Sequence, residues 1–143
     1  MNSYKTSIKL NESPNRVFSA ISENLGNWWG KQTKSKLKQG TVFKVSWGEP
    51  WYKFKVIKFT KNVAMVWECV DANQIIDGLD GVEKEWVGTK IHWNLKPLEN
   101  RNVILEFEHE GLIPEFICFN FCSKAWTHFL ENSLVNYLSV KEK

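Results

Sequence analysis

The stretch EFICFNFCSKAWTHFLENSLVNYLSV, residues 115–140, has the apolar spacing of one long helix. Along one side of this helix, the following residues recur every three or four positions: Phe119, Cys122, Trp126, Phe129, Ser133 and Tyr137. At about 1.5 Å per residue, the helix would be roughly 38 Å long. A helix of this length can cross a whole sheet, so we expect the preceding residues to supply that sheet.

Six preceding segments alternate between apolar and polar residues, which is typical of half-buried strands. They are residues 4–10, 41–47, 51–59, 63–70, 89–95 and 103–110. Short turns such as Gly48-Glu49-Pro50 predict antiparallel pairing of neighbouring strands. Ser13 and Pro14 predict a helix start after the first strand. The order β-α-β-β-β-β-β-α in residues 1–143 indicates a single α+β domain with a helix covering the sheet.

Three segments resemble the START/SRPBCC superfamily, and within it the group named for the activator of heat-shock-protein-90 ATPase homologue. They are SPNRVFSAISENLGNWW (13–29), EWVGTKIHWNLKPLENRNVILEFEHEGL (85–112) and SKAWTHFLENSLVNYL (123–138). The second segment ends in the family's His-x-Gly followed by an apolar residue, here His109 to Leu112. The resemblance covers nearly the whole chain and implies the helix-grip fold, a curved antiparallel sheet wrapped around a long C-terminal helix. One departure is Ala125, where the family often has glycine, and this would narrow the space beside the helix.

The resemblance also implies a pocket between the sheet and the C-terminal helix, which would hold a small hydrophobic ligand such as a lipid or an aromatic compound. The candidate ligand-binding residues are Trp28, Trp29, Phe43, Val45, Trp47, Phe54, Trp67, Trp93, Phe107, His109, Phe119, Cys122, Trp126 and Phe129. The chain has eight tryptophans and nine phenylalanines, more large rings than a small core requires. The alternative is that these rings pack together as a solid core.

Trp28 and Trp29 lie in LGNWWG, residues 25–30, which has the composition of a turn. In the resembled fold, this segment sits at the open end of the grip, near the C-terminal helix. We expect one tryptophan to anchor in the core and the other to border the pocket entrance. Gly26 and Gly30 are expected to let the backbone turn tightly on either side of the pair.

His109 is the polar residue of most interest, because strand alternation places it on the inward face with Leu105 and Phe107. One interpretation is a core histidine bonded to a backbone carbonyl or to a helix residue. The other is a pocket donor that orients an oxygen atom of the ligand. By the same alternation, we expect Glu106 and Glu108 on the solvated outer face.

Charge and composition exclude several classes of protein. The net charge of +3 is too small for the strongly basic surface typical of nucleic-acid-binding domains. The alternating Lys34, Lys36 and Lys38 are interpreted as a solvated strand edge. We recognise no signal sequence or membrane-spanning segment, and the three cysteines are not spaced as a disulfide framework, so we expect a cytoplasmic protein. We predict no metal site, cofactor or catalytic residue from the motifs.

Three functions compete. The first is non-enzymatic binding of a small hydrophobic molecule by a monomer or a homodimer. The second is an enzyme of the cyclase or dehydratase kind that uses the same pocket, with His109 for proton transfer, although no acid–base pair is evident inside. The third is a co-chaperone surface, but 143 residues leave no room for the additional N-terminal domain of the known co-chaperone activators.

Overall fold

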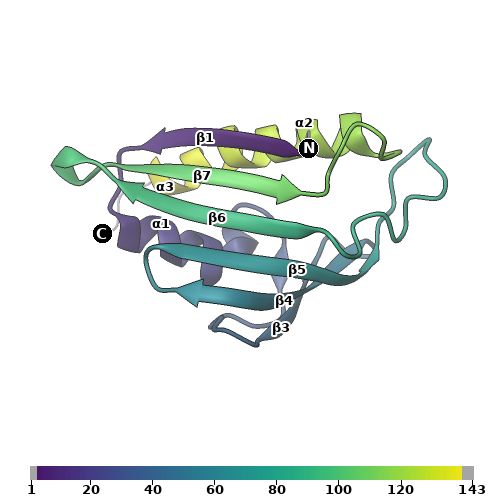
Figure 1. Ribbon diagram of the computed structural model, residues 1–143, viewed down its shortest axis with the longest axis horizontal. Helices are drawn as coiled ribbons and strands as arrows, with labels where there is room; N and C mark the ends of the chain where they lie inside the picture. Colours follow the sequence, from purple (N-terminus) through teal and green to yellow (C-terminus); the bar gives the residue numbers. More distant parts are fainter. Residues whose placement is uncertain (1–2, 140–143) are drawn as a thin grey trace.

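The computed structural model describes residues 3–139. Within them, seven strands form one antiparallel sheet in the order β1-β7-β6-β5-β4-β3-β2 (Figure 1). The strands are β1 (Tyr4–Leu10), β2 (Lys31–Gln32), β3 (Val42–Ser46), β4 (Trp51–Thr60), β5 (Ala64–Asn73), β6 (Lys90–Pro97) and β7 (Val103–Glu110). Strands β2 to β7 pair in chain order, whereas β1 pairs with β7, with Tyr4 opposite His109.

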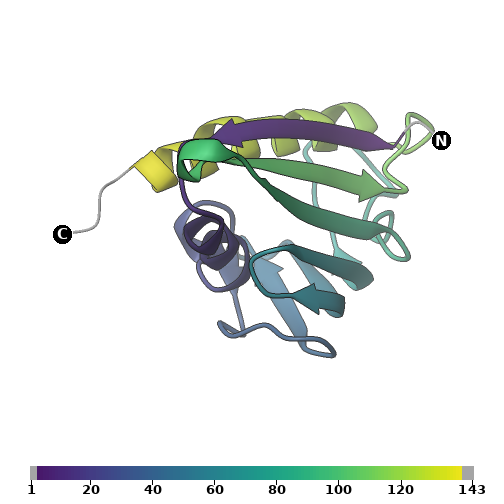
Figure 2. The same ribbon diagram turned by 60° about the vertical axis from the view of Figure 1, so that its left-hand side comes forward.

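The sheet curls around helix α1 (Pro14–Ser22) and the C-terminal helix, which lie on its concave side (Figure 2). The C-terminal helix consists of α2 (Phe119–His128), the π-helical turn η3 (Phe129–Leu134) and α3 (Val135–Ser139). Short 3₁₀ turns, η1 (Leu25–Asn27) and η2 (Glu99–Arg101), lie in the connections. The predicted α+β helix-grip architecture is therefore confirmed.

Helix α1 begins as the sequence predicts. The Ser13 hydroxyl caps it by accepting a hydrogen bond from the backbone N–H of Arg16 at 3.3 Å, and Pro14 is its first residue. Phe18 and Ile21 on its apolar side are buried in the core. The cap thus fixes where the chain leaves β1 and turns to cover the sheet.

The C-terminal helix begins at Phe119, which corrects the start predicted for the segment 115–140. The Glu85 carboxylate accepts hydrogen bonds from the backbone N–H groups of Ile117 and Cys118. The first backbone N–H groups of a helix have no acceptor within the helix, and the Glu85 carboxylate supplies one here. These hydrogen bonds fix the position at which the helix begins. The final position of the predicted segment lies outside the described residues.

The π-helical turn η3 changes which residues of the C-terminal helix are buried. The buried residues follow one another at four-residue intervals: Cys122, Trp126, Leu130, Leu134 and Leu138. An α-helix of 3.6 residues per turn would rotate such a series away from the sheet, whereas the wider π turn keeps it facing inward. Ser133 and Tyr137, which α-helical spacing places on this side, are therefore only partly buried.

Lys34, Lys36 and Lys38 do not form the predicted strand edge. Their side chains are exposed in the loop between β2 and β3, while the edge strand at this end of the sheet is the two-residue β2. Leu37 is buried between two of these lysines and packs in the core. The alternation therefore reflects a loop with one anchored residue rather than a strand.

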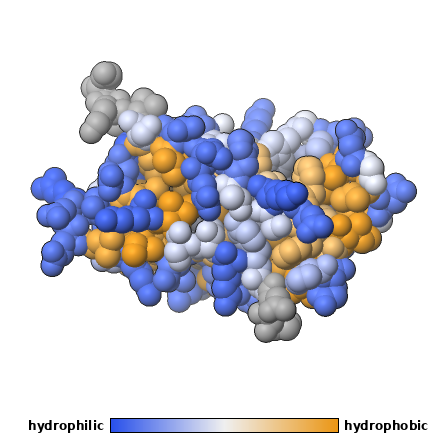
Figure 3. Space-filling view, turned by 90° about the horizontal axis from the view of Figure 1, so that it is seen from above, coloured by the Kyte–Doolittle hydropathy of each residue, from blue (hydrophilic) through white to orange (hydrophobic). Residues whose placement is uncertain are grey.

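Figure 3 views the molecule from the side of β1 and the C-terminal helix, and it shows two apolar areas separated by polar residues. One of them lies at the end of the molecule where α2 begins. Ile117 and Phe121, at this end, are 53% and 55% exposed. Within residues 3–139, we find no helix with the length and apolar character needed to cross a membrane.

Candidate functional site

Stacked aromatic rings fill the interior between the sheet and the C-terminal helix, and Trp29 lies at their centre. The Trp29 ring stacks on Trp126 with 5.0 Å between ring centroids, and it lies 6.2 Å from the rings of Phe54 and Trp67. The Trp126 ring also lies 4.5 Å from the ring of Phe107. These offset and tilted contacts are the favoured geometries of aromatic pairs in a close-packed core.

The two tryptophans of LGNWWG have different surroundings. The indole N–H of Trp28 donates to the carbonyl of Ala20 at 2.8 Å, which ties this ring to α1, and the ring meets Trp93 edge-on. Trp29 stacks on Trp126 of the C-terminal helix and borders a hollow beside it. Trp28 is therefore the core anchor, and Trp29 is the residue that reaches the open side.

Gly30 permits close packing beside a tight turn. The backbone does turn tightly here, since the N–H groups of Trp28, Trp29 and Gly30 all bond to the Leu25 carbonyl, but neither Gly26 nor Gly30 has a positive φ. A Cβ atom on Gly30 would lie 2.6 Å from the Trp47 ring and 2.7 Å from Cγ1 of Val45. The Trp47 indole N–H also donates to the Trp29 carbonyl at 2.7 Å. The absent side chain of Gly30 thus lets the Trp47 ring lie directly on the backbone.

Gly30→Ala is expected to lower the free energy of unfolding by about 1–3 kcal/mol, because the added methyl group must displace the Trp47 ring and Val45. Gly26→Ala is the matched control, since its added methyl group would meet nothing closer than 4.0 Å. We expect the control to change the free energy by less than about 0.5 kcal/mol. Urea denaturation measures both values. If both variants change the free energy of unfolding by a similarly small amount, the close contact between the Trp47 ring and the Gly30 backbone is not important for stability.

An apolar hollow of about 210 Å³ opens where the aromatic core meets the C-terminal helix. Its wall is formed by the β3–β4 hairpin, the connection between β5 and β6, and the C-terminal helix, together with Trp29. The lining residues are Trp29, Trp47, Pro50, Tyr52, Ile75, Ile76, Trp86, Phe121, Cys122, Ala125, Trp126 and Phe129. Nearly all of this wall is aromatic or aliphatic, which is the composition of small-molecule sites.

The hollow brings together only part of the predicted set. The predicted residues that line it are Trp29, Trp47, Cys122, Trp126 and Phe129. The other candidates do not line it: Trp28, Phe43, Val45, Phe54, Trp67, Trp93, Phe107, His109 and Phe119. All of these except the partly buried Phe119 are buried among other core side chains. The structure thus divides the predicted pocket residues into a filled core and a smaller open site.

Sequence reasoning missed the wall contributed by the connection between β5 and β6. This connection has no apolar period, because it contains bends and turns rather than a strand or helix. Its Trp86 is only 4% exposed and stacks on Tyr52 at 3.9 Å between ring centroids. The sequence signal that could have identified this wall was Trp86 itself, a large apolar residue directly after the acid-rich residues 83–85. Ala125, the departure from the resembled family, also lies in the wall of the hollow.

His109 is fully buried, and both of its ring nitrogens have partners within the protein. An indole N–H can only donate, so Nδ1 of His109 accepts from Nε1 of Trp126 at 3.0 Å. The ring proton then lies on Nε2, which donates to Oγ1 of Thr89 at 2.8 Å, and the Thr89 hydroxyl donates to the carbonyl of Trp86 at 2.6 Å. Burial lowers the pKa of His109 to about 3, so the ring is neutral. These contacts fit the core-histidine interpretation.

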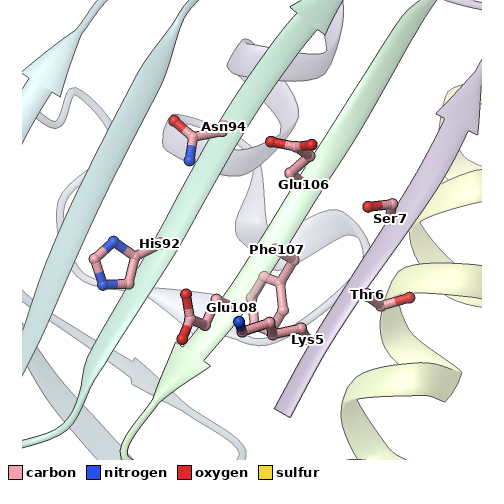
Figure 4. Close-up of a pocket in the computed structure, with 8 residues that line it drawn as sticks. All are labelled: Lys5, Thr6, Ser7, His92, Asn94, Glu106, Phe107 and Glu108. Atoms are coloured by element: carbon pink, nitrogen blue, oxygen red, sulfur yellow. The ribbon is translucent and has the colours of Figure 1, made fainter. Parts of the chain in front are cut away.

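A second hollow, of about 500 Å³, lies on the outer face of the sheet (Figure 4). Its lining residues come from β1, β6 and β7: Lys5, Thr6, Ser7, His92, Asn94, Glu106, Phe107 and Glu108. Nearby polar side chains already have partners, since Nε2 of His92 lies 2.7 Å from Glu110 and Nζ of Lys96 lies 3.1 Å from Glu106. Three adjacent strands of one sheet supply the whole lining, so this is an open polar depression on a solvated sheet face.

Sequence comparisons identify no relative: no family model matches the chain, and no curated protein matches it. Solved structures do match over nearly the whole chain. The Aha1 dimer from Colwellia psychrerythraea is 22% identical, with a TM-score of 0.78 and 100% of both chains covered. MLL2253 from Mesorhizobium loti is 15% identical, with a TM-score of 0.76, 97% of this chain covered and 99% of that chain.

DynU16, from the dynemicin biosynthetic locus, is 13% identical to this chain, with a TM-score of 0.75. The match covers 98% of this chain and 48% of DynU16. Identities at this level establish a shared architecture and leave activity to be argued from the site itself. The strand order, the curled sheet, the C-terminal helix and these structures agree that the chain has the helix-grip fold.

Proposed function

We propose that this protein binds a small hydrophobic molecule in the apolar hollow between the C-terminal helix and the wall formed by Trp29 and Trp47. The observation that carries this proposal is an open space of about 210 Å³ with an almost wholly apolar lining, beside an interior that is otherwise filled by rings. Burial of a ligand against such a wall is favoured by the hydrophobic effect. The site thus lies at the mouth of the grip and not in its centre.

The size of the hollow favours a compact ligand. Pockets for drug-sized molecules occupy about 300–1,000 Å³. A hollow of about 210 Å³ therefore fits one or two fused rings, or a short aliphatic chain, better than a sterol or a long lipid. The aromatic faces of Trp29, Trp86 and Trp126 favour a flat ring system.

One polar group is available to orient the ligand. The indole N–H of Trp86 is buried, has no oxygen or nitrogen acceptor and contacts the Cys118 and Cys122 thiols. A thiol sulfur is a weak acceptor, so an oxygen atom of a ligand that reached this N–H would bind it more strongly. We therefore favour a ring that carries a hydroxyl or carbonyl oxygen.

Binding has more support than catalysis. Among the described residues that line the hollow, none is a histidine or a carboxylate. The Tyr52 hydroxyl donates to Oε1 of Gln74 at 2.5 Å, and burial raises the pKa of Tyr52 far above its usual value. No group of three or more potential metal ligands occurs in the part of the chain that the structure describes. These features supply no acid–base pair for a cyclase or dehydratase reaction.

The test of this proposal is binding of 2-naphthol, a flat two-ring molecule with one oxygen, measured by tryptophan fluorescence. Ala125→Leu adds bulk to the wall of the hollow without removing a core contact. We expect it to weaken binding at least about tenfold, which corresponds to 1.4 kcal/mol. Lys124→Leu is the matched control, because it places the same side chain on the same helix at an exposed position outside the lining. Binding to the control should be unchanged.

Two results would contradict the proposal. Equal affinities of Ala125→Leu and the unmodified chain, at equal stability, would place the ligand outside the hollow. Absence of a fluorescence response to 2-naphthol and to a series of other one-ring and two-ring compounds would mean that the hollow is not a ligand site.

For assembly, we propose a monomer or a homodimer. The similar Colwellia structure is a dimer. The exposed Ile117 and Phe121 at the start of α2 supply apolar surface that self-association could cover (Figure 3). Light scattering across a range of protein concentrations distinguishes the two states.

A further inference from the structure

Two cysteines lie side by side at the start of the C-terminal helix. Sγ of Cys118 and Sγ of Cys122 are 2.6 Å apart, and both residues are buried, free thiols. This distance is about 0.5 Å longer than a disulfide bond of about 2.05 Å. A small movement would therefore allow the two sulfur atoms to bond.

The pair is positioned by contacts on both sides. The Cys118 backbone N–H is held by Glu85 at 3.0 Å, and Sγ of Cys122 lies 3.3 Å from Oε1 of Gln74. The single S–H of Cys122 donates to Sγ of Cys118, and this contact lowers the pKa of Cys118 while burial opposes the effect. The same contact raises the pKa of Cys122, so Cys118 is the thiol of the pair that ionises more readily.

A small oxidant can reach this pair through the hollow. Cys122 lies in the wall of the hollow, with Cys118 beside it. Cys69 offers a contrast, because it is buried, its thiol donates to the Asp71 carbonyl at 3.3 Å, and burial raises its pKa to about 12. Within one chain, the structure thus places a contacting thiol pair and a separate thiol with a raised pKa.

We propose that Cys118 and Cys122 form an oxidation site, at which a peroxide converts the two thiols into an intramolecular disulfide. This proposal goes beyond ligand binding and does not depend on it. One thiolate attacks a peroxide oxygen, the O–O bond breaks, and the other oxygen leaves as water or an alcohol after taking the proton. The second sulfur then attacks the sulfenic sulfur, the S–O bond breaks and water leaves. The two sulfur atoms lose two electrons in total, which reduce the peroxide.

The experiment treats the folded full-length chain with hydrogen peroxide, unfolds it, alkylates the free thiols with iodoacetamide and maps the products by mass spectrometry. We expect a chain that is about 2 Da lighter before alkylation because two hydrogen atoms are lost. We also expect Cys69 to be alkylated and Cys118 and Cys122 to be protected until dithiothreitol reduces them. Cys122→Ser should prevent the disulfide and leave a sulfenic acid on Cys118, which dimedone traps. Cys69→Ser, the matched control, should oxidise like the unmodified chain.

Three results would overturn the proposal: alkylation of all three cysteines after peroxide treatment, a disulfide that includes Cys69, or sulfinic acid at Cys118 or Cys122 without a disulfide. The unmodified chain supplies each of these readouts, so a poorly folded variant would not obscure them. Because no ligand is added, the outcome is also separate from the 2-naphthol test.

Discussion

Trp126→Ala is expected to lower the free energy of unfolding by about 4 kcal/mol or more, the largest stability effect that we predict. The Trp126 ring stacks on Trp29 and packs against Phe107, so its removal leaves a cavity in the centre of the ring cluster. It also removes the N–H that bonds Nδ1 of His109, and a buried polar atom without a partner adds about 1–3 kcal/mol to the loss. Urea denaturation measures the effect.

Phe121→Ala is the matched control for Trp126→Ala. Phe121 lies on the same helix and also lines the hollow, but its side chain is 55% exposed. We expect this variant to change the free energy of unfolding by less than about 1 kcal/mol and still to weaken binding of 2-naphthol. Similar stability losses for the two variants would show that the ring cluster does not hold the helix against the sheet.

His109 is expected to make the protein less stable in acid. Its pKa is about 6.5 in an unfolded chain and is lowered to about 3 in the folded protein, because burial disfavours the charged ring. Below pH 6.5, the unfolded state therefore binds a proton that the folded state does not. The free energy of unfolding is therefore unaffected by His109 above about pH 6.5, and it decreases as the pH falls from 6.5 toward 3. Between pH 6.5 and pH 4.5, this one group should lower the free energy of unfolding by about 2 kcal/mol.

His109→Gln isolates this effect. A glutamine side chain carries an amide oxygen that can accept from Trp126 and an amide N–H that can donate to Thr89, but it does not titrate. Urea denaturation at several pH values should therefore show a weaker acid dependence in the variant than in the unmodified chain. Equal pH dependence would mean that His109 is not held neutral. Because both nitrogens bond within the protein, we also expect the variant to keep its affinity for 2-naphthol, whereas a pocket donor would lose it.

The sheet could be predicted from the sequence because one face of most strands is buried. In β6 and β7 the alternation is regular, so Trp93, Phe107 and His109 were placed correctly on the inward face. The short β2 has two residues, too few for any period to be recognised. Alternation of lysines around Leu37 then gave a false strand, because one anchored loop residue produces the same pattern.

The site was harder to predict. A strand pattern shows which side chains point inward, but it does not show whether these side chains leave an open cavity between them. Trp67 and Trp93 point inward as predicted, yet neighbouring rings fill the room around them. The open space depends on Trp86, which an irregular connection places against Tyr52, and on the π-helical turn η3, which alters the buried side of the helix. Both features arise from tertiary packing rather than from local periodicity.

The most direct test of the account is nuclear magnetic resonance of the indole N–H groups during titration with 2-naphthol. The chain has eight tryptophans, and four of them line the hollow: Trp29, Trp47, Trp86 and Trp126. We predict the largest shifts for these four signals and small shifts for Trp28, Trp67 and Trp93, which lie in the filled core. Shifts at Trp67 and Trp93 that equal or exceed those of the four would place the ligand inside the core and contradict the account.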